Sequence, residues 1–81
     1  MTPVEHSEEQ ERADSAERHE QASEWHTSAA VRHDAAALRW TEVGDRARAE
    51  FEHRNARIER EAAELEGDRA QFYREAVLPH Q

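Results

Sequence analysis

Small and apolar residues recur every seven positions along both halves of this chain, and this spacing predicts helices that pack along a common seam. Steps of three and four residues are typical of coiled coils, and no strand-like alternation occurs anywhere in the sequence. The repeat therefore predicts an all-α fold. Its members are His19, Ala22, His26, Ala29, His33, Ala36, Trp40 and Val43, followed by Phe51, Ile58, Leu65 and Phe72 with Ala49, Ala56, Ala63, Ala70 and Val77 beside them.

Turn-forming residues interrupt the repeat at Gly44-Asp45. Glycine suits the left-handed position that follows a helix, and aspartate can cap the next helix immediately. We therefore predict an antiparallel two-helix hairpin with its turn at Gly44-Asp45. A single continuous helix through Gly44 is the alternative. The second helix is expected to continue through Gly67, because the repeat keeps its phase there.

Signals at the two ends complete the predicted organisation. Thr2-Pro3-Val4-Glu5 matches a capping box, and Leu78-Pro79 is expected to end the second helix. The chain then consists of an acidic helical arm over residues 1–17, the hairpin over residues 18–78 and a tail over residues 79–81. The arm is expected to project beyond the second helix, because the first helix is longer.

The hairpin predicts which residues face one another. Large side chains should meet alanines at every level, since interdigitating layers need this alternation. His19, His26 and His33 are then expected to face alanines, which cannot bind a metal ion, with Glu59, Glu66 and Arg60 flanking these alanines. The predicted pairs are Trp40 with Ala49, His33 with Ala56, His26 with Ala63, His19 with Ala70, Ala36 with Phe51, Ala29 with Ile58 and Ala22 with Leu65.

The composition predicts that the hairpin does not act alone. With 81 residues and a net charge of −8, the chain has few large apolar side chains for a core. Chains of this size bury too little surface to be very stable as monomers. We therefore expect two copies to form a homodimer, most simply a four-helix bundle.

The charge is concentrated near the N-terminus. Residues 1–24 carry eight acidic side chains and two arginines. This acidic field suits a basic protein partner and has the wrong sign for nucleic acid. The predicted function is therefore a non-enzymatic protein–protein interaction module: an adaptor, an inhibitor or an assembly subunit. The predicted partner-binding residues are Glu8, Glu9, Glu11, Trp25, Val31 and Leu38, the aromatic residue serving as an anchor.

A second hypothesis is a metal-binding bundle that would take zinc, copper or iron. His19, His26 and His33 lie seven residues apart, which separates them by about 10.5 Å along a helix. No two of them can therefore share one ion, and further ligands would have to come from other helices. Glu50 and His53 form the Glu-x-x-His pattern of carboxylate-bridged metal bundles. Packing, response to protonation and metal binding all stay open for the ladder.

Other classes of function lack their sequence signals. The chain has no cysteine, which excludes disulfides and thiolate metal sites. No stretch has the length and apolarity of a membrane span, and no secretory signal is evident, so the expected location is the cytoplasm. The serines lack a base with an orienting partner, and the glycines are too few for a phosphate loop. We expect neither catalysis nor a cofactor.

The stretch Ala36-x3-Trp40-x3-Gly44-Asp45-x-Ala47 resembles part of the helix-turn-helix of tetratricopeptide repeats. It occurs once, covers about a dozen residues and lacks the remaining aromatic and proline positions of that pattern. The resemblance implies a helical hairpin and says nothing of function.

Overall fold

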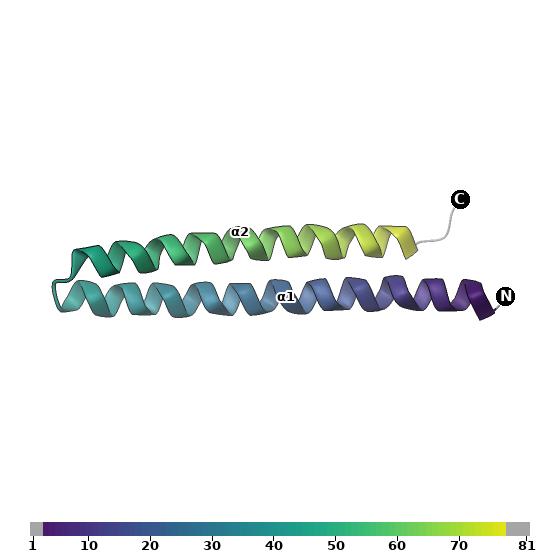
Figure 1. Cartoon of the computed structure of the whole chain (residues 1–81), viewed down its shortest axis with the longest axis horizontal. Helices are drawn as coiled ribbons and strands as arrows, with labels where there is room; N and C mark the ends of the chain where they lie inside the picture. Colours follow the sequence, from purple (N-terminus) through teal and green to yellow (C-terminus); the bar gives the residue numbers. More distant parts are fainter. Residues whose placement is uncertain (1–2, 78–81) are drawn as a thin grey trace.

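The protein forms a long antiparallel hairpin of two helices. The computed structural model describes the backbone of residues 3–77 and the side chains of residues 8–75. Helix α1 spans Pro3–Glu42 and helix α2 spans Arg46–Val77, and the two lie side by side (Figure 1). The Cα envelope measures 63 × 20 × 12 Å. The predicted hairpin is confirmed, and the alternative of one continuous helix is wrong.

The turn is closed by the residues that the sequence indicates. Gly44 has a φ of +82°, and its N–H donates to the carbonyl of Thr41 at 3.0 Å, while the Asp45 N–H donates to the carbonyl of Trp40 at 2.9 Å. This pair of bonds is the Schellman motif. Asp45 Oδ1 then accepts from the Arg48 N–H at 3.0 Å, so one aspartate ends the turn and caps α2.

Both helices are uninterrupted over their described length. α2 continues through Gly67, as predicted. Neither helix, over residues 3–77, combines the length and apolarity needed to cross a bilayer. The capping box at Thr2-Pro3-Val4-Glu5, the predicted stop at Leu78-Pro79 and the tail over residues 79–81 lie outside the residues whose side chains are described.

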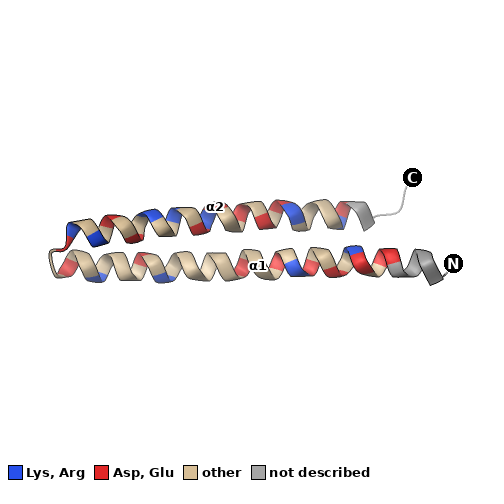
Figure 2. Cartoon of the chain, in the orientation of Figure 1, with Lys and Arg blue, Asp and Glu red and all other residues tan. Residues whose placement is uncertain are grey.

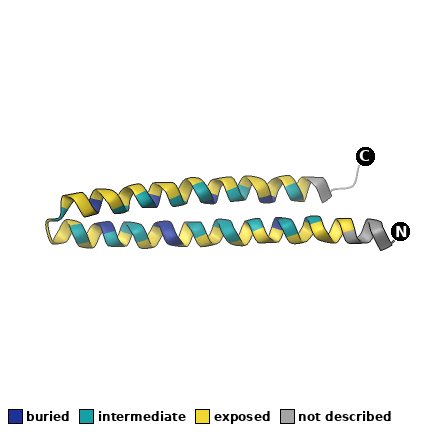
Figure 3. Cartoon of the chain, viewed as in Figure 1, coloured by how far each residue is buried: buried dark blue, intermediate teal, exposed yellow. Residues whose placement is uncertain are grey.

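The core between the helices consists of methyl groups. Every side chain that is classed as buried, among those described, is an alanine, and none is large. Figure 3 places these residues where the two helices face each other. A seam of methyl groups lets two helices approach closely, since the side chains at the contact set the interaxial distance. The buried alanines are Ala16, Ala29, Ala30, Ala37, Ala49, Ala56, Ala63 and Ala70.

The predicted facing partners of the three histidines are wrong. His26, expected opposite Ala63, instead hydrogen-bonds Glu59, four residues earlier in α2, at 2.9 Å. Ser23 is the residue that contacts Ala63, through a bond of 2.8 Å from its Oγ to the backbone carbonyl. The other two ladder histidines show the same displacement.

The expected packing of large residues against alanines is also wrong within the hairpin. Phe51, Ile58, Leu65 and Phe72 point away from the seam and are 50–63% exposed. The physical reason is the closeness of the two backbones, which leaves room for methyl groups but none for rings or branched chains. The close approach of the helices also brings the imidazoles within hydrogen-bonding distance of carboxylates. The predicted pairing placed alanines opposite these histidines.

Part of the acidic arm lies beside α2 rather than beyond it. Within α1, acidic residues are concentrated toward the N-terminus (Figure 2). Ala16 is only 3% exposed, and Tyr73 of α2 lines an open hollow of about 200 Å³ together with Glu8 and Arg12. The prediction that residues 3–17 project is therefore wrong for residues 8–17, because α2 extends to Val77 and passes this part of α1.

We predict that enlarging a seam alanine destabilises the protein. Ala30 is 0% exposed, so Ala30→Leu should lower the free energy of unfolding by about 1–3 kcal/mol through overpacking. Ala35→Leu changes an exposed position of the same helix and should alter it by less than about 0.5 kcal/mol. Urea unfolding at one protein concentration measures both, and equal effects would contradict the methyl seam.

Candidate functional site

Three histidines of α1 each contact a glutamate of α2 across the seam, and we call this set the His–Glu ladder. The partners recur every seven residues on both helices, so an antiparallel pairing brings all three together at once. An ionised carboxylate only accepts hydrogen bonds, so the ring Nδ1–H is the donor in each. The bonds are His19–Glu66 at 2.6 Å, His26–Glu59 at 2.9 Å and His33–Glu52 at 3.2 Å.

The ladder is half-buried. Its histidine side chains are 25–34% exposed and its glutamates 13–20%. The sequence predicts the histidines and places Glu59 and Glu66 beside the alanines expected opposite them, but it does not pair them with the histidines and does not single out Glu52. A usable signal was present, because Glu52, Glu59 and Glu66 also recur every seven residues, but the many other acidic residues of α2 obscured it.

Glu66 is the carboxylate most affected by its surroundings. The hydrogen bond from His19 lowers the pKa of Glu66 below its ordinary value of 4.5, and Arg69 at 2.5 Å acts in the same direction, while burial opposes both. The carboxylate is therefore held ionised at this end of the ladder.

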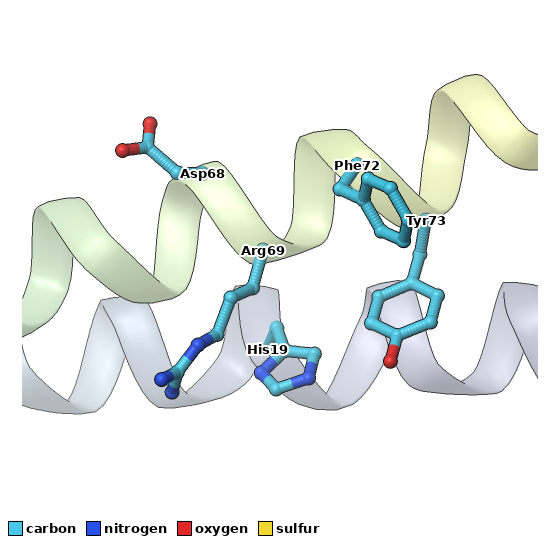
Figure 4. A pocket seen from close by; sticks show the side chains of 5 residues that line it. All are labelled: His19, Asp68, Arg69, Phe72 and Tyr73. Carbon is cyan, nitrogen blue, oxygen red and sulfur yellow. The ribbon is translucent and has the colours of Figure 1, made fainter.

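Aromatic side chains surround the same end of the ladder (Figure 4). The ring of Tyr73 stacks on His19, with centroids 5.5 Å apart and planes 6° apart. Phe72, Tyr73 and Arg69 line, with His19, an open hollow of about 400 Å³. Asp68 borders the hollow, and its carboxylate points away from the other side chains (Figure 4).

One long side of the hairpin, which we call the charged flank, is closed by ion pairs between the helices. Arg74 bonds Glu20, and Arg60 bonds Asp34. His53 Nδ1 lies 3.7 Å from Asp34. The hydrogen bond from Arg60 is the main cause that lowers the pKa of Asp34 below 3.8.

The α2 residues of the charged flank lie along the border with α1. Arg60 and Arg74 contact α1, as described above. A side-chain carbon on Gly67 would lie 3.8 Å from Ser23 Oγ. Seven-residue spacing places all of these positions on one stripe of α2, which borders the seam.

The opposite long side of the hairpin carries the His–Glu ladder along the seam, with a row of apolar residues on each helix outside it, and we call these two rows together the apolar face. Each large residue of the α2 repeat comes two positions before a residue of the charged flank, which puts it about 160° away around the helix. On α1, the matching residues come two positions after Glu20, Thr27, Asp34 and Thr41. Ala29 is buried in the seam, so the apolar face contains Ala22, Ala36 and Val43 of α1 and Phe51, Ile58, Leu65 and Phe72 of α2.

The predicted apolar anchors do not form one surface. Trp25 comes two positions before Thr27 and lies at the α1 edge of the apolar face, where its ring packs edge-on against His26 with centroids 5.0 Å apart. Val31 and Leu38 lie three positions before and four after Asp34, which places them near the charged flank. All three anchors are 60–61% exposed.

The predicted acidic contacts are accessible. Glu8, Glu9 and Glu11 are exposed on α1. Glu8 Oε2 lies 4.0 Å from Arg12, one helical turn later. An exposed pair of this kind adds little stability. The carboxylates of Glu8, Glu9 and Glu11 remain accessible to solvent. Their contact with a basic partner stays a prediction.

The predicted metal ligands are not brought together within one chain. Each ladder histidine has one glutamate partner, Glu50 is exposed, and His53 is 60% exposed on the charged flank. Among the side chains of residues 8–75, no group of three or more histidine, aspartate or glutamate residues is placed to hold a metal ion. Binding of zinc, copper or iron stays a prediction.

Comparison of the chain with protein-family models, with curated proteins and with solved structures finds no match. Its function is therefore argued from the geometry above.

We predict that Glu66 makes stability depend on pH in the acidic range. Its folded pKa lies below its ordinary value of 4.5, so its contribution is present above that value and is lost as pH falls through the lowered pKa. Glu66→Gln should reduce thermal stability at pH 7 and converge on the wild type at pH 3. Glu64→Gln, at an exposed position, is the control. A Glu66→Gln deficit that is constant with pH would refute the prediction.

Proposed function

We propose that this chain is a non-enzymatic helical interaction module that self-associates through its apolar face into a dimeric four-helix bundle. One observation carries the proposal. Among the side chains of residues 8–75, the hairpin buries only alanines, while eight large apolar side chains are 50–71% exposed. Four of these eight form a continuous row along α2, and Val43 and Trp25 border the same face on α1.

The energetics favour covering this face. A large apolar side chain contributes roughly 1.5–3 kcal/mol on full burial, and the methyl group of alanine much less. The hairpin leaves its largest potential gain in water. A partner that covers Phe51, Ile58, Leu65 and Phe72 would supply burial that the seam lacks.

The exposed area supports the same conclusion. The chain exposes 6361 Å², whereas a compact monomer of its 9.4 kDa mass exposes roughly 5,000 Å². The excess exceeds the roughly 800 Å² that each partner buries in a standard interface. A second copy of the chain is a partner that is always present and carries the same face.

A module of this kind can serve as an adaptor, an inhibitor or an assembly subunit. Burial of the apolar face would leave the charged flank and the acidic part of α1 in solvent. The carboxylates of Glu8, Glu9 and Glu11 would then be free to contact a basic protein, and a dimer would offer two such groups. This bivalence would raise the avidity for a multivalent partner.

We predict that the wild-type protein has twice the mass of one chain in solution. Ile58→Glu with Leu65→Glu puts charges at the centre of the α2 row and should abolish the dimer. Val31→Glu with Leu38→Glu makes the same change at two residues with similar exposure outside the apolar face, and should leave the mass unchanged. Sedimentation equilibrium measures all three proteins.

The thermal midpoint provides a second readout. If association supplies stability, the midpoint rises with protein concentration in the wild type and not in the Ile58→Glu, Leu65→Glu variant. A wild-type protein that sediments as a fully helical single chain, with a midpoint independent of concentration, would contradict the proposal.

A further inference from the structure

We infer that two copies associate antiparallel, with α2 of one copy lying along α2 of the other about a two-fold axis near Ala62. The turns of the two hairpins then lie at opposite ends of the assembly. This inference rests on the proposed self-association and specifies its geometry.

The apolar row is symmetric about the centre of its helix. α2 spans Arg46–Val77, so its midpoint falls between Glu61 and Ala62. The same midpoint bisects the row. Reversing the helix therefore superposes Phe51 on Phe72 and Ile58 on Leu65, aromatic on aromatic and aliphatic on aliphatic. An antiparallel pair thus aligns every large residue of the row over the whole helix, as an isologous interface requires.

The neighbouring stripe of α2 has the same symmetry. Asn55, Ala62 and Arg69 are spaced by seven residues and lie beside the apolar row, three positions before Ile58, Leu65 and Phe72. In the antiparallel pair Ala62 meets Ala62 of the second copy at the axis. Asn55 there meets Arg69 of the second copy, whose guanidinium can donate to the amide oxygen. A small residue therefore lies where the two helices come closest.

Charge complementarity favours the antiparallel direction over the parallel one. On the outer border of the row, Arg54 comes opposite Asp68 of the second copy, twice in each dimer. A parallel pair would instead oppose Arg54 to Arg54 and Asp68 to Asp68. Glu61 meets itself in both arrangements and does not discriminate. The two halves of α2 also differ in charge. Residues 46–61 hold five arginines and four acidic residues, and residues 62–77 hold two arginines and four acidic residues.

Two hollows in the apolar face agree with this direction. One, of about 400 Å³, lies beside Phe72. The other, also of about 400 Å³, is lined by Val43, Trp40 and Glu52 at the turn end of the hairpin. Phe51 directly precedes Glu52 in α2. The antiparallel pair brings the Phe51 ring of one copy to the first hollow of the other, and the Phe72 ring to the second. Both aromatic side chains then gain contacts that neither has in one hairpin.

Single cysteines test the arrangement, because the native chain contains none. Ala62→Cys should form a covalent dimer under mild oxidation, since it places two thiols at the axis. Asn55→Cys is the matched control on the same stripe. It should not link to itself, because the two copies of this residue lie about 21 Å apart in the antiparallel pair, beyond the Cα separation of a disulfide. Mixing Asn55→Cys with Arg69→Cys should restore cross-linking.

Each outcome decides between arrangements. Self-linking of Asn55→Cys as efficient as that of Ala62→Cys would show a parallel pair and overturn the inference. Linking of Ala62→Cys only to Ala22→Cys would show that α1 packs on α2 of the second copy, which also overturns it. In both cases sedimentation would still show a dimer, whereas a single-chain mass would refute the proposed function itself.

A charge exchange gives a readout that needs no cysteine. Arg54→Asp and Asp68→Arg, taken singly, should each weaken dimerisation several-fold, because each creates like-charge pairs across the interface. The double variant should return to near the wild-type dissociation constant. Circular dichroism confirms that each variant remains helical. Additive weakening in the double variant would contradict the antiparallel pairing.

Discussion

The packing of methyl groups along the seam determines the rest of this structure. Alanine at every buried position lets the two helices approach closely. That closeness excludes rings and branched chains from the seam and places Phe51, Ile58, Leu65 and Phe72 on the outside. A conventional core of large residues would have buried these side chains and left little reason for association. Here the same residues that are excluded from the hairpin form the surface on which the proposed function depends.

The His–Glu ladder adds specificity to a seam that is otherwise uniform. Methyl groups alone would pack almost equally well after a slip of one helical turn. The three imidazole–carboxylate bonds would be lost in that slip, and each half-buried carboxylate would lose its imidazole donor. Half-buried polar pairs therefore favour one register, much as polar residues do in coiled coils. Their net contribution to stability is modest, since burial opposes part of the gain.

Local signals in the sequence were sufficient for the helices and the turn. Gly44 and Asp45 act through their own backbone and side-chain chemistry, so the hairpin could be predicted without knowing what lies opposite. The side-chain partners of the histidines could not, because they depend on the distance between two backbones, and the seven-residue repeat allows several pairings. The histidines of the site were found for their spacing. Glu59 and Glu66 were expected only beside the facing alanines, because a pairing by side-chain size does not match hydrogen-bond donors with acceptors.

The tight turn has a role that follows from the regularity of the seam. Contacts between α1 and α2 repeat about every 10.5 Å, so a helix from another molecule would satisfy them nearly as well as the chain's own. Only the short connection through Gly44 gives the chain's own α2 the advantage of high local concentration. Straightening that connection would let hairpins exchange helices and join end to end, which is the route to domain-swapped fibres. The residue that bends the chain is thus also the one that keeps the molecule finite.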